Sequence, residues 1–246
     1  MSDLEPFYER LDAAFHHALA QWRVSPDALV LLFSGGVDSS LIGWELRSHP
    51  QLMLSTVGTK GSADLAAAEE GARRLALPWT PSLVTAEDVQ EVAKKVEREL
   101  GGLPPVRRSV LLAFATAVDR APPGPLLCGQ GADELFLGYA HYRGLGPSAA
   151  ERRSTEDLDQ VISDDWPRTV HIARRLGRAV HAPYLHAEFV AAARSIPVER
   201  RLPLPEPKAF FRAWARHRGL PEPLAARPKR ALQYGSGIDR IARREP

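Results

Sequence analysis

The 246-residue chain has one cysteine, no long apolar run and almost no net charge, and each of these excludes a class of protein. Its single cysteine, Cys128, excludes a disulfide framework and any zinc site built on two or more cysteines. No apolar run approaches the roughly 20 residues that cross a bilayer, and the acidic N-terminus is unlike a signal peptide. The net charge of +2 is too small to attract a polyanion by itself. We therefore expect a cytoplasmic protein that has no membrane partner and for which nucleic acid is a poor candidate ligand.

The apolar segments that the chain does contain predict an α/β fold. Residues at helical spacing between 4 and 22 predict an opening helix. Dense apolar runs predict buried strands at 28–33, 51–57, 79–84 and 125–128. Helices are expected between the strands. The first of them ends near residue 47, and the others span 63–75, 86–100 and 109–118. Strands that alternate with helices indicate a doubly wound parallel sheet with right-handed crossovers.

Beyond residue 152 the sequence predicts no strand. Helical segments near 155–180, 187–195, 208–218 and 235–244 are separated by prolines. We therefore expect an N-terminal helix over 1–27, a nucleotide-binding α/β core over 28–150, and a C-terminal helical region over 151–246 that completes the same domain.

The first motif, SGGVDSS over residues 34–40, lies where the first strand gives way to a helix. Two glycines let the backbone turn sharply, and the helix N-terminus and serine hydroxyls offer donors to an anion. Asp38 would repel a phosphate unless a Mg²⁺ ion lay between them. No Gly-Lys-Ser/Thr follows, so this is not a Walker A loop; a plain strand–helix turn with a serine cap is the structural alternative.

This motif resembles the PP-loop of the adenine-nucleotide α-hydrolases, which bind ATP and release pyrophosphate. The resemblance implies that the loop holds pyrophosphate and that the edge of the second strand holds adenine through its backbone. Asp64 could cap the following helix or contact the substrate, and the structural role is at least as strong a candidate. The turn that follows the fourth strand is expected to contribute as well. The expected nucleotide-binding residues are Phe33, Ser34, Gly35, Gly36, Asp38, Ser39, Ser40, Val57, Gly58, Cys128 and Gly129.

The second motif, CGQGADELFLGY over residues 128–139, distinguishes among PP-loop enzymes. It is similar to the (S/T)-G-x-G-x-D-E-L-F-x-G-Y signature of the asparagine synthetase synthase domain. In a doubly wound sheet the fourth strand ends beside the first, and ligands bind at such carboxyl ends. Asp133 can therefore meet Asp38 across one Mg²⁺–pyrophosphate, so both are expected metal ligands; a helix-capping Asp133 is the alternative.

Later segments resemble the same family. The stretch HAPYLH over 181–186 is similar to its R-x-P-F-L-D, with His181 and His186 in place of Arg and Asp. Residues 207–212 resemble its K-x-x-L-R segment, which implies that Lys208, one of five lysines, stabilises the transition state. The run RPKR over 227–230, followed by 233–237, is similar to the family's R-x-K tail, although a solvated basic C-terminus is an equal alternative.

Two departures from the family bear on the reaction. Full asparagine synthetases begin with a glutaminase whose nucleophile is a cysteine, whereas this chain has Ser2 and about 27 residues before its first strand. We therefore expect ammonia from solution or from a separate glutaminase subunit. Gln130 stands where the family places an acid, and an amide cannot act as a general base. It can orient ammonia or a carboxylate, and Glu134 and His186 are candidate substitute bases.

The first functional hypothesis is an ATP-dependent amide ligase. A carboxylate, most simply that of aspartate, would form an acyl-adenylate that ammonia then converts into an amide, with Lys208, Gln130 and Asp133 as the catalytic residues. The alternatives are a degenerate ATP-binding subunit that works with a partner and a PP-loop enzyme that modifies tRNA or nucleotides. The sequence does not identify the acceptor acid or the nitrogen source. A homo-oligomer is one candidate for the oligomeric state.

Overall fold

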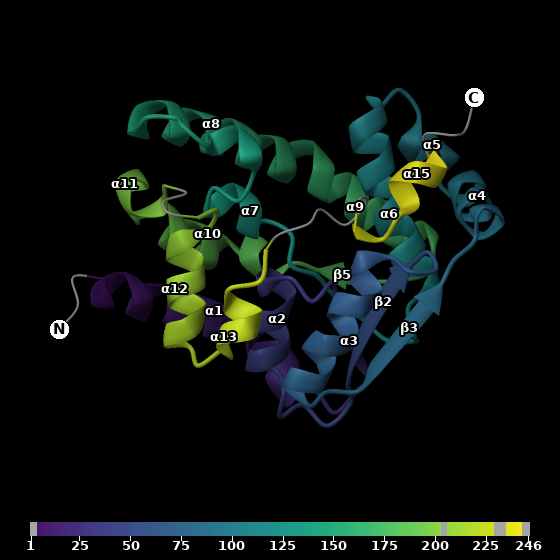
Figure 1. Ribbon diagram of the computed structural model, residues 1–246, viewed down its shortest axis with the longest axis horizontal. Coiled ribbons are helices and arrows are strands. Elements are labelled where there is room, and N and C mark those ends of the chain that lie inside the picture. Colours follow the sequence, from purple (N-terminus) through teal and green to yellow (C-terminus); the bar gives the residue numbers. More distant parts are fainter. Residues whose placement is uncertain (1–3, 203–205, 229–234, 243–246) are drawn as a thin grey trace.

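A five-stranded parallel sheet lies at the centre of the computed structural model, which describes residues 4–202, 206–228 and 235–242 (Figure 1). The strands are arranged in the order β3–β2–β1–β4–β5, and every neighbouring pair is parallel. Their bounds are β1 Leu29–Leu32, β2 Leu52–Gly58, β3 Trp79–Leu83, β4 Leu126–Leu127 and β5 Val180–His181. This order, in which the chain reverses direction across the sheet at β1, confirms the doubly wound α/β fold.

Helices connect the strands and cover the sheet. The first group is α1 Glu5–Val24, α2 Val37–Glu45, α3 Ala63–Leu75, α4 Ala86–Lys95, α5 Glu97–Leu100 and α6 Pro105–Arg120. The second is α7 Ala132–Leu135, η1 Ala140–Tyr142, α8 Pro147–Gln160, the π-helical η2 Val161–Asp165, α9 Trp166–Arg175 and η3 Pro183–Leu185. The last is α10 Ala187–Arg194, α11 Val198–Arg201, α12 Ala209–His217, α13 Glu222–Ala225 and α15 Ile238–Ala242.

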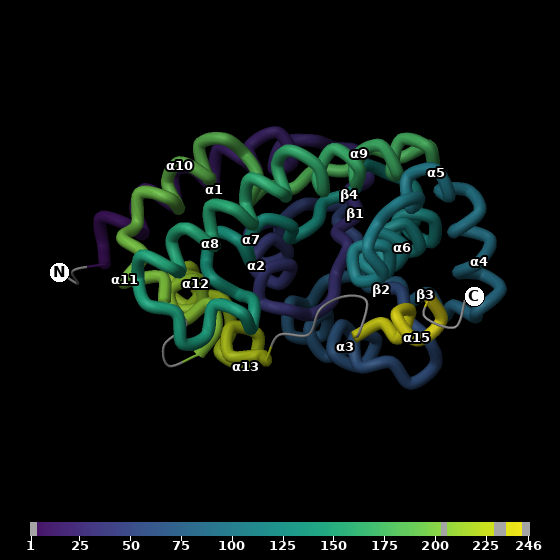
Figure 2. Tube along the Cα trace, turned by 90° about the horizontal axis from the view of Figure 1, so that it is seen from above, coloured from purple at the N-terminus to yellow at the C-terminus, as the bar shows by residue number. Residues whose placement is uncertain are grey.

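Both faces of the sheet are buried, as the apolar run of β1 predicts. Leu29 and Leu31 pack into one core cluster with residues of α1, α2, α3, α10 and α12. Val30, whose side chain alternates to the opposite face, packs into a second cluster with residues of α4, α6 and α9. The view from above shows α4, α5 and α6 at one end of the molecule and α11, α12 and α13 at the other, with β1 between them (Figure 2).

The prediction that no strand follows residue 152 is wrong. Val180 and His181 form β5, which pairs with β4 through a bond from the Leu126 amide to the Ala179 carbonyl and one from the Cys128 amide to the His181 carbonyl. A two-residue strand has no periodicity that a sequence pattern can reveal. The helical region therefore contributes the edge of the sheet, and the division of the chain at residue 150 stays a prediction.

Two helices differ from their expected bounds. The segment expected as one helix over 86–100 is interrupted at Val96, whose φ of −120° separates α4 from α5. The helix expected over 109–118 begins earlier, because Pro105 occupies its first turn, where the missing amide proton costs nothing. Among the described helices, none is long and apolar enough to cross a membrane.

Candidate active site

The PP-loop motif forms the turn from β1 into α2. Gly35 adopts a φ of +68°, and a Cβ there would lie 2.6 Å from the Ala67 carbonyl oxygen. Gly36 is the N-cap of α2 without a side-chain cap, so the first amides of this nine-residue helix point toward the turn. The Ser34 hydroxyl accepts a bond from the Gly36 amide, and Ser39 donates to the Gly36 carbonyl. This helix terminus is suited to hold an anion.

Phe33 and Ser40, two further residues expected around this loop, are both buried. Phe33 is buried against Gly71, and its carbonyl accepts a bond from Thr56. Ser40 is fully buried, and its hydroxyl has no hydrogen-bond partner among the described residues. A buried hydroxyl without a partner costs free energy unless a ligand or water reaches it.

The second motif forms the turn from β4 into α7, beside the first. Gly131 adopts a φ of +97°, which a glycine accepts without steric cost. A Cβ on Gly129 would lie 3.0 Å from the Cβ of Asp38, so this turn packs directly against the start of α2. Cys128 is buried, and burial raises the pKa of its thiol to about 11, which keeps it protonated. Gln130 lies partly exposed at the middle of the turn.

Lys208 joins the two motifs. Its ammonium lies 2.6 Å from both carboxylate oxygens of Asp38 and 2.7 Å from Oδ1 of Asp133, and only 1% of the side chain is exposed. Burial alone would lower the pKa of Lys208, but the two carboxylates outweigh it and raise the pKa above its ordinary value. The lysine is therefore a buried cation between the carboxylates that follow β1 and β4.

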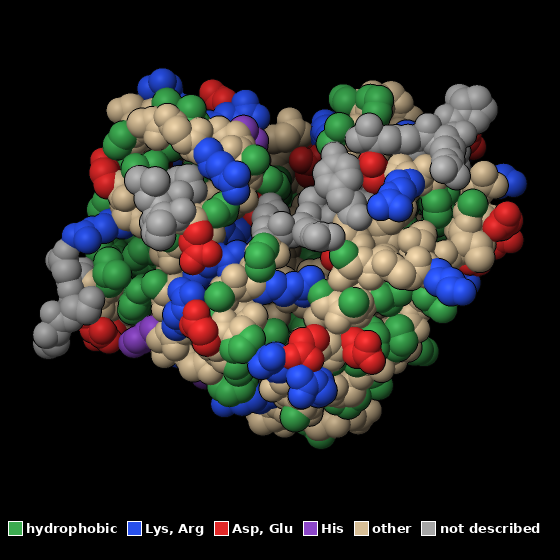
Figure 3. Space-filling model, in the orientation of Figure 1, with side chains coloured by type: hydrophobic (Ala, Val, Ile, Leu, Met, Phe, Trp, Pro, Cys, Tyr) green, Lys and Arg blue, Asp and Glu red, His purple; other side chains and the backbone are tan. Residues whose placement is uncertain are grey.

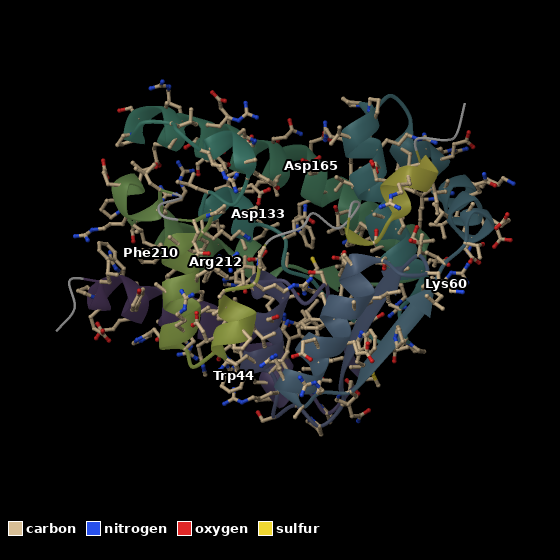
Figure 4. The ribbon with its side chains drawn as sticks, viewed as in Figure 1. Trp44, Lys60, Asp133, Asp165, Phe210 and Arg212 are labelled. Carbon is tan, nitrogen blue, oxygen red and sulfur yellow. The ribbon has the colours of Figure 1, made fainter. Side chains whose placement is uncertain are left out.

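The two carboxylates form a donor set that fits Mg²⁺. Asp38 and Asp133 converge on one positive charge, and carboxylate oxygens together with phosphate oxygens are the ligands that Mg²⁺ prefers. Figure 4 places Asp133 near the middle of the molecule, and Arg212 on α12 adds positive charge on the same side. On the face that Figure 3 shows, Lys and Arg side chains lie near the middle as well as around the rim.

Gly138 is part of the site, although the signature alone did not assign it a role. A Cβ there would lie 2.0 Å from Oδ1 of Asp133 and 2.4 Å from Cε of Lys208. Its amide also donates to the Asp133 carbonyl at 2.8 Å. Only a residue without a side chain leaves room for the ion pair, which explains the glycine of the D-E-L-F-x-G-Y run.

Glu134 is buried beside the site, next to Asp133. It is 3% exposed, and its carboxylate accepts a bond from the Tyr139 hydroxyl. Burial, with a further contribution from the charge of Asp133, raises the pKa of Glu134 to about 7. Its backbone carbonyl accepts a bond from Ser154, which ties α7 to α8. These contacts agree with a bracing role; the role of a substitute base stays a prediction.

His186, the other candidate base, has its described contacts elsewhere. Its ring meets that of His17 at 5.2 Å between centroids, where α1 and the start of α10 pack together. The neighbouring Tyr184 does reach the site, since its hydroxyl donates to the Asp38 carbonyl at 2.8 Å. His181 is half-buried in β5 against Trp22.

The end of β2, where adenine is expected, is covered by the C-terminal segment. Val57 is buried, the Gly58 carbonyl accepts a bond from Val84, and the Thr59 amide donates to Ser236. Of the two roles considered for Asp64, the N-cap position of α3 belongs to Ser62; Asp64 lies in the first turn of that helix and faces Gly235.

The tail segment contacts the PP-loop. A guanidinium nitrogen of Arg227 donates to the Ser34 carbonyl at 3.0 Å, which ties the end of the helical region to the first motif. The remainder of the expected R-x-K tail, Lys229 and Arg230 with Gln233 and Tyr234, lies outside the described residues.

Comparison with known proteins places this geometry in a family. The sequence matches the asparagine synthase family over residues 10–151 and 144–245. The chain belongs to the asparagine synthase family. Membership of this family supports an ATP-dependent, ligase-type enzyme and confirms the resemblance that the two motifs predict.

Two curated relatives of this synthase-family chain carry the words glutamine-hydrolyzing in their names. The chain is 29% identical to a putative asparagine synthetase [glutamine-hydrolyzing] 1 of Methanocaldococcus jannaschii, covering 95% of this chain and 50% of the relative. It is 26% identical to an asparagine synthetase [glutamine-hydrolyzing] of Mesocricetus auratus, covering 95% and 44%. The chain therefore spans about half the length of these curated relatives.

Among solved structures, an NH3-dependent NAD synthetase from Campylobacter jejuni is similar over 100% of this chain and 98% of that one. The two share 16% of their residues, with a TM-score of 0.38. An NMN synthetase from Francisella tularensis gives 11% identity, 99% and 94% coverage and a TM-score of 0.37.

Proposed function

We propose that the protein is an AMP-forming carbon–nitrogen ligase that uses ATP to turn a carboxylate into an amide. The observation that carries this proposal is the buried ammonium of Lys208, paired with the partly exposed carboxylates of Asp38 and Asp133 between two turns that are suited to bind phosphates. A lysine that stays charged between two carboxylates is suited to a substrate that brings both negative charge and a divalent cation.

In the first step, an oxygen of the acceptor carboxylate attacks the α-phosphorus of ATP, and the bond to the β-phosphate breaks. The acyl-adenylate forms and pyrophosphate leaves into the turn of Ser34, Gly35 and Gly36, where the α2 amides bind its oxygens. Lys208 stabilises the negative charge that develops on the phosphoryl oxygens, a contribution of typically 10²- to 10³-fold for one such donor.

Asp38 and Asp133 would hold Mg²⁺, which neutralises the charge of the pyrophosphate when it is bound. Lys208 now donates to both of these carboxylates, so binding of Mg–ATP requires the ammonium to turn from the carboxylates toward the phosphate oxygens. We expect the lysine side chain to move, whereas the two turns keep their positions.

In the second step, the nitrogen of ammonia attacks the acyl carbon, the bond to the AMP oxygen breaks, and the nitrogen gives up a proton to solvent water. Gln130 lies at the middle of the second turn and can orient the nucleophile or the carboxylate by hydrogen bonding. Gln130 cannot take the proton. Because only unprotonated ammonia attacks, we expect the reaction to be fastest where the pH keeps ammonia unprotonated. Aspartate is the first candidate acceptor, and a separate glutaminase subunit is a candidate nitrogen supplier.

The test is exchange of labelled pyrophosphate into ATP in the presence of aspartate and a panel of other carboxylic acids. Exchange that depends on one of the acids supports adenylation, and ammonium should then give AMP and the amide of that acid. Binding of ATP without exchange for any acid would sink the proposal.

A second candidate, an ATP-binding subunit without synthetic activity, is favoured by Gln130 alone, since the family places an acid at that position. It predicts that Mg–ATP raises the melting temperature while no pyrophosphate is released with any acid. The two candidates differ in the wild type, since a ligase releases pyrophosphate and an inactive subunit does not. In Gln130→Glu, which places an acid at this position, a ligase should change its rate of amide formation. An inactive subunit should gain synthetic activity only if the rest of its site is intact.

A further inference from the structure

We propose a second metal site, specific for a zinc-class divalent ion, formed by His17, His186 and Glu188 on the α1–α10 side of the molecule. One candidate ligand atom from each of the three residues lies within 4.8 Å of the others. The helices that carry them pack side by side, with α10 beginning directly after His186 (Figure 2). The site is separate from Asp38, Asp133 and the proposed reaction.

The three ligand atoms lie close enough together for small side-chain rotations to arrange them around one ion. Nδ1 of His17 lies 2.5 Å from Oε2 of Glu188, and the rings of His17 and His186 lie 5.2 Å apart between centroids. Two ligands that each bind zinc at about 2.0–2.1 Å in tetrahedral geometry are about 3.3 Å apart. The side chains of His17 and Glu188 are more than half exposed, so small rotations can bring the three atoms to that spacing.

His186 supplies the second observation. Its Nδ1 is buried and has no hydrogen-bond partner among the described residues, and the residue is the N-cap of α10 with its ring next to that of His17. A buried ring nitrogen without a partner costs free energy that a coordinated ion would recover. An ion pair between His17 and Glu188 alone explains the contact of those two residues and leaves this nitrogen unsatisfied.

The ligand set identifies the class of ion. Imidazole nitrogens with one carboxylate suit zinc, cobalt and nickel, whereas Mg²⁺ requires mostly oxygen ligands. Three protein ligands leave a position for water. The bound ion would join two helices whose ligands are 171 residues apart in sequence, next to Tyr184, whose hydroxyl bonds the carbonyl of Asp38.

The experiment is titration of the tag-free, chelator-treated full chain with Co²⁺, followed by visible absorption. We expect one equivalent to give the intense bands of four- or five-coordinate cobalt and to be displaced by Zn²⁺. His17→Gln and Glu188→Gln should remove the bands. His16→Gln, which changes an exposed histidine one position away on the same helix, is the matched control and should keep them.

A second readout protects the test from misfolded variants and from binding at the nucleotide site. Zn²⁺ should raise the melting temperature of the wild type and of His16→Gln, and not that of His17→Gln. Asp133→Asn should retain the cobalt bands. The proposal is overturned if cobalt does not saturate at one equivalent, if His17→Gln binds it as well as His16→Gln does, or if Asp133→Asn abolishes the bands. Loss of pyrophosphate exchange would not bear on it.

Discussion

At the scale of single residues, Lys208 is constrained in both its backbone and its side chain. Its φ of +59° is left-handed, which costs a non-glycine residue about 1–3 kcal/mol, and its ammonium is fixed between two carboxylates. The surrounding turns must therefore compensate for both. Strain of this kind is typical of positions where a side chain has to be held in one direction for function.

Lys208→Met should lower pyrophosphate exchange by at least about 10²-fold, because one donor to the developing charge is lost. Lys60→Met, on an exposed lysine that Figure 4 shows far from Asp133, is the control and should leave exchange unchanged. Removing the cation also leaves the two partly buried carboxylates without their shared positive charge, so the melting temperature is measured in parallel. Wild-type exchange in a folded Lys208→Met protein would exclude the assigned role.

Gly138→Ala should disrupt the same ion pair by steric overlap. The added Cβ would lie 2.0 Å from Asp133 and 2.4 Å from Lys208, so one of the two side chains must leave its place. We expect the affinity for Mg–ATP, measured by calorimetry, to fall at least tenfold. Gly146→Ala is the matched control, since nothing lies within 4 Å of a Cβ at that position. Equal affinities in the two variants would argue against a tight fit at Gly138.

The Glu134 carboxyl predicts a pH dependence of stability. Burial raises its pKa from the ordinary 4.5 to about 7, so the folded state holds a proton that the unfolded chain releases between these values. Stability from this group is complete below pH 4.5 and is lost as the pH rises to about 7, by on the order of 3 kcal/mol.

Glu134→Gln should remove this loss, because an amide does not ionise. The free energy of unfolding in urea, measured at pH 5 and pH 8, should fall less between the two in the variant than in the wild type. Glu91→Gln, on an exposed glutamate, should behave as the wild type. A variant with the wild-type pH dependence would show that Glu134 does not titrate in this range.

At the scale of elements, Arg178 connects the loop before β4 to the start of β5. Its guanidinium donates to the Ala121 carbonyl at 2.9 Å and to the Gly124 carbonyl at 2.7 Å. Arg178→Met should lower the free energy of unfolding by about 2–3 kcal/mol, since the carbonyls lose charged donors. Arg174→Met, on an exposed arginine of the preceding helix, should cost less than about 0.5 kcal/mol. Equal melting curves for Arg178→Met and Arg174→Met would contradict this role of Arg178.

The elements that could be predicted are those whose sequence pattern is long enough to read. The apolar runs of β1 and β2 and the helix over 63–75 have the expected bounds to within one residue or so, because burial on both faces leaves a continuous signal. β5 could not be predicted, since its two residues are held by pairing with β4. The break at Val96 likewise has no glycine or proline to mark it.

At the scale of the whole molecule, the site could be predicted in part. Two turns that follow strands β1 and β4 must meet at the carboxyl edge of the sheet, so Asp38 and Asp133 were expected to converge. The position of Lys208 does not follow from that rule, because α12 could pack in many places; only the family resemblance indicated it. Nothing in the sequence indicated that Arg227 would reach the Ser34 carbonyl across 193 residues.

Adenylation and the role of Lys208 are tested together by acid-dependent pyrophosphate exchange of the wild type and Lys208→Met, in one assay with ATP and magnesium. We expect exchange with at least one carboxylic acid, aspartate first, and a loss of about 10²-fold or more in the variant. No exchange with any acid in a wild type that binds ATP, or equal exchange by the two proteins, would contradict this expectation.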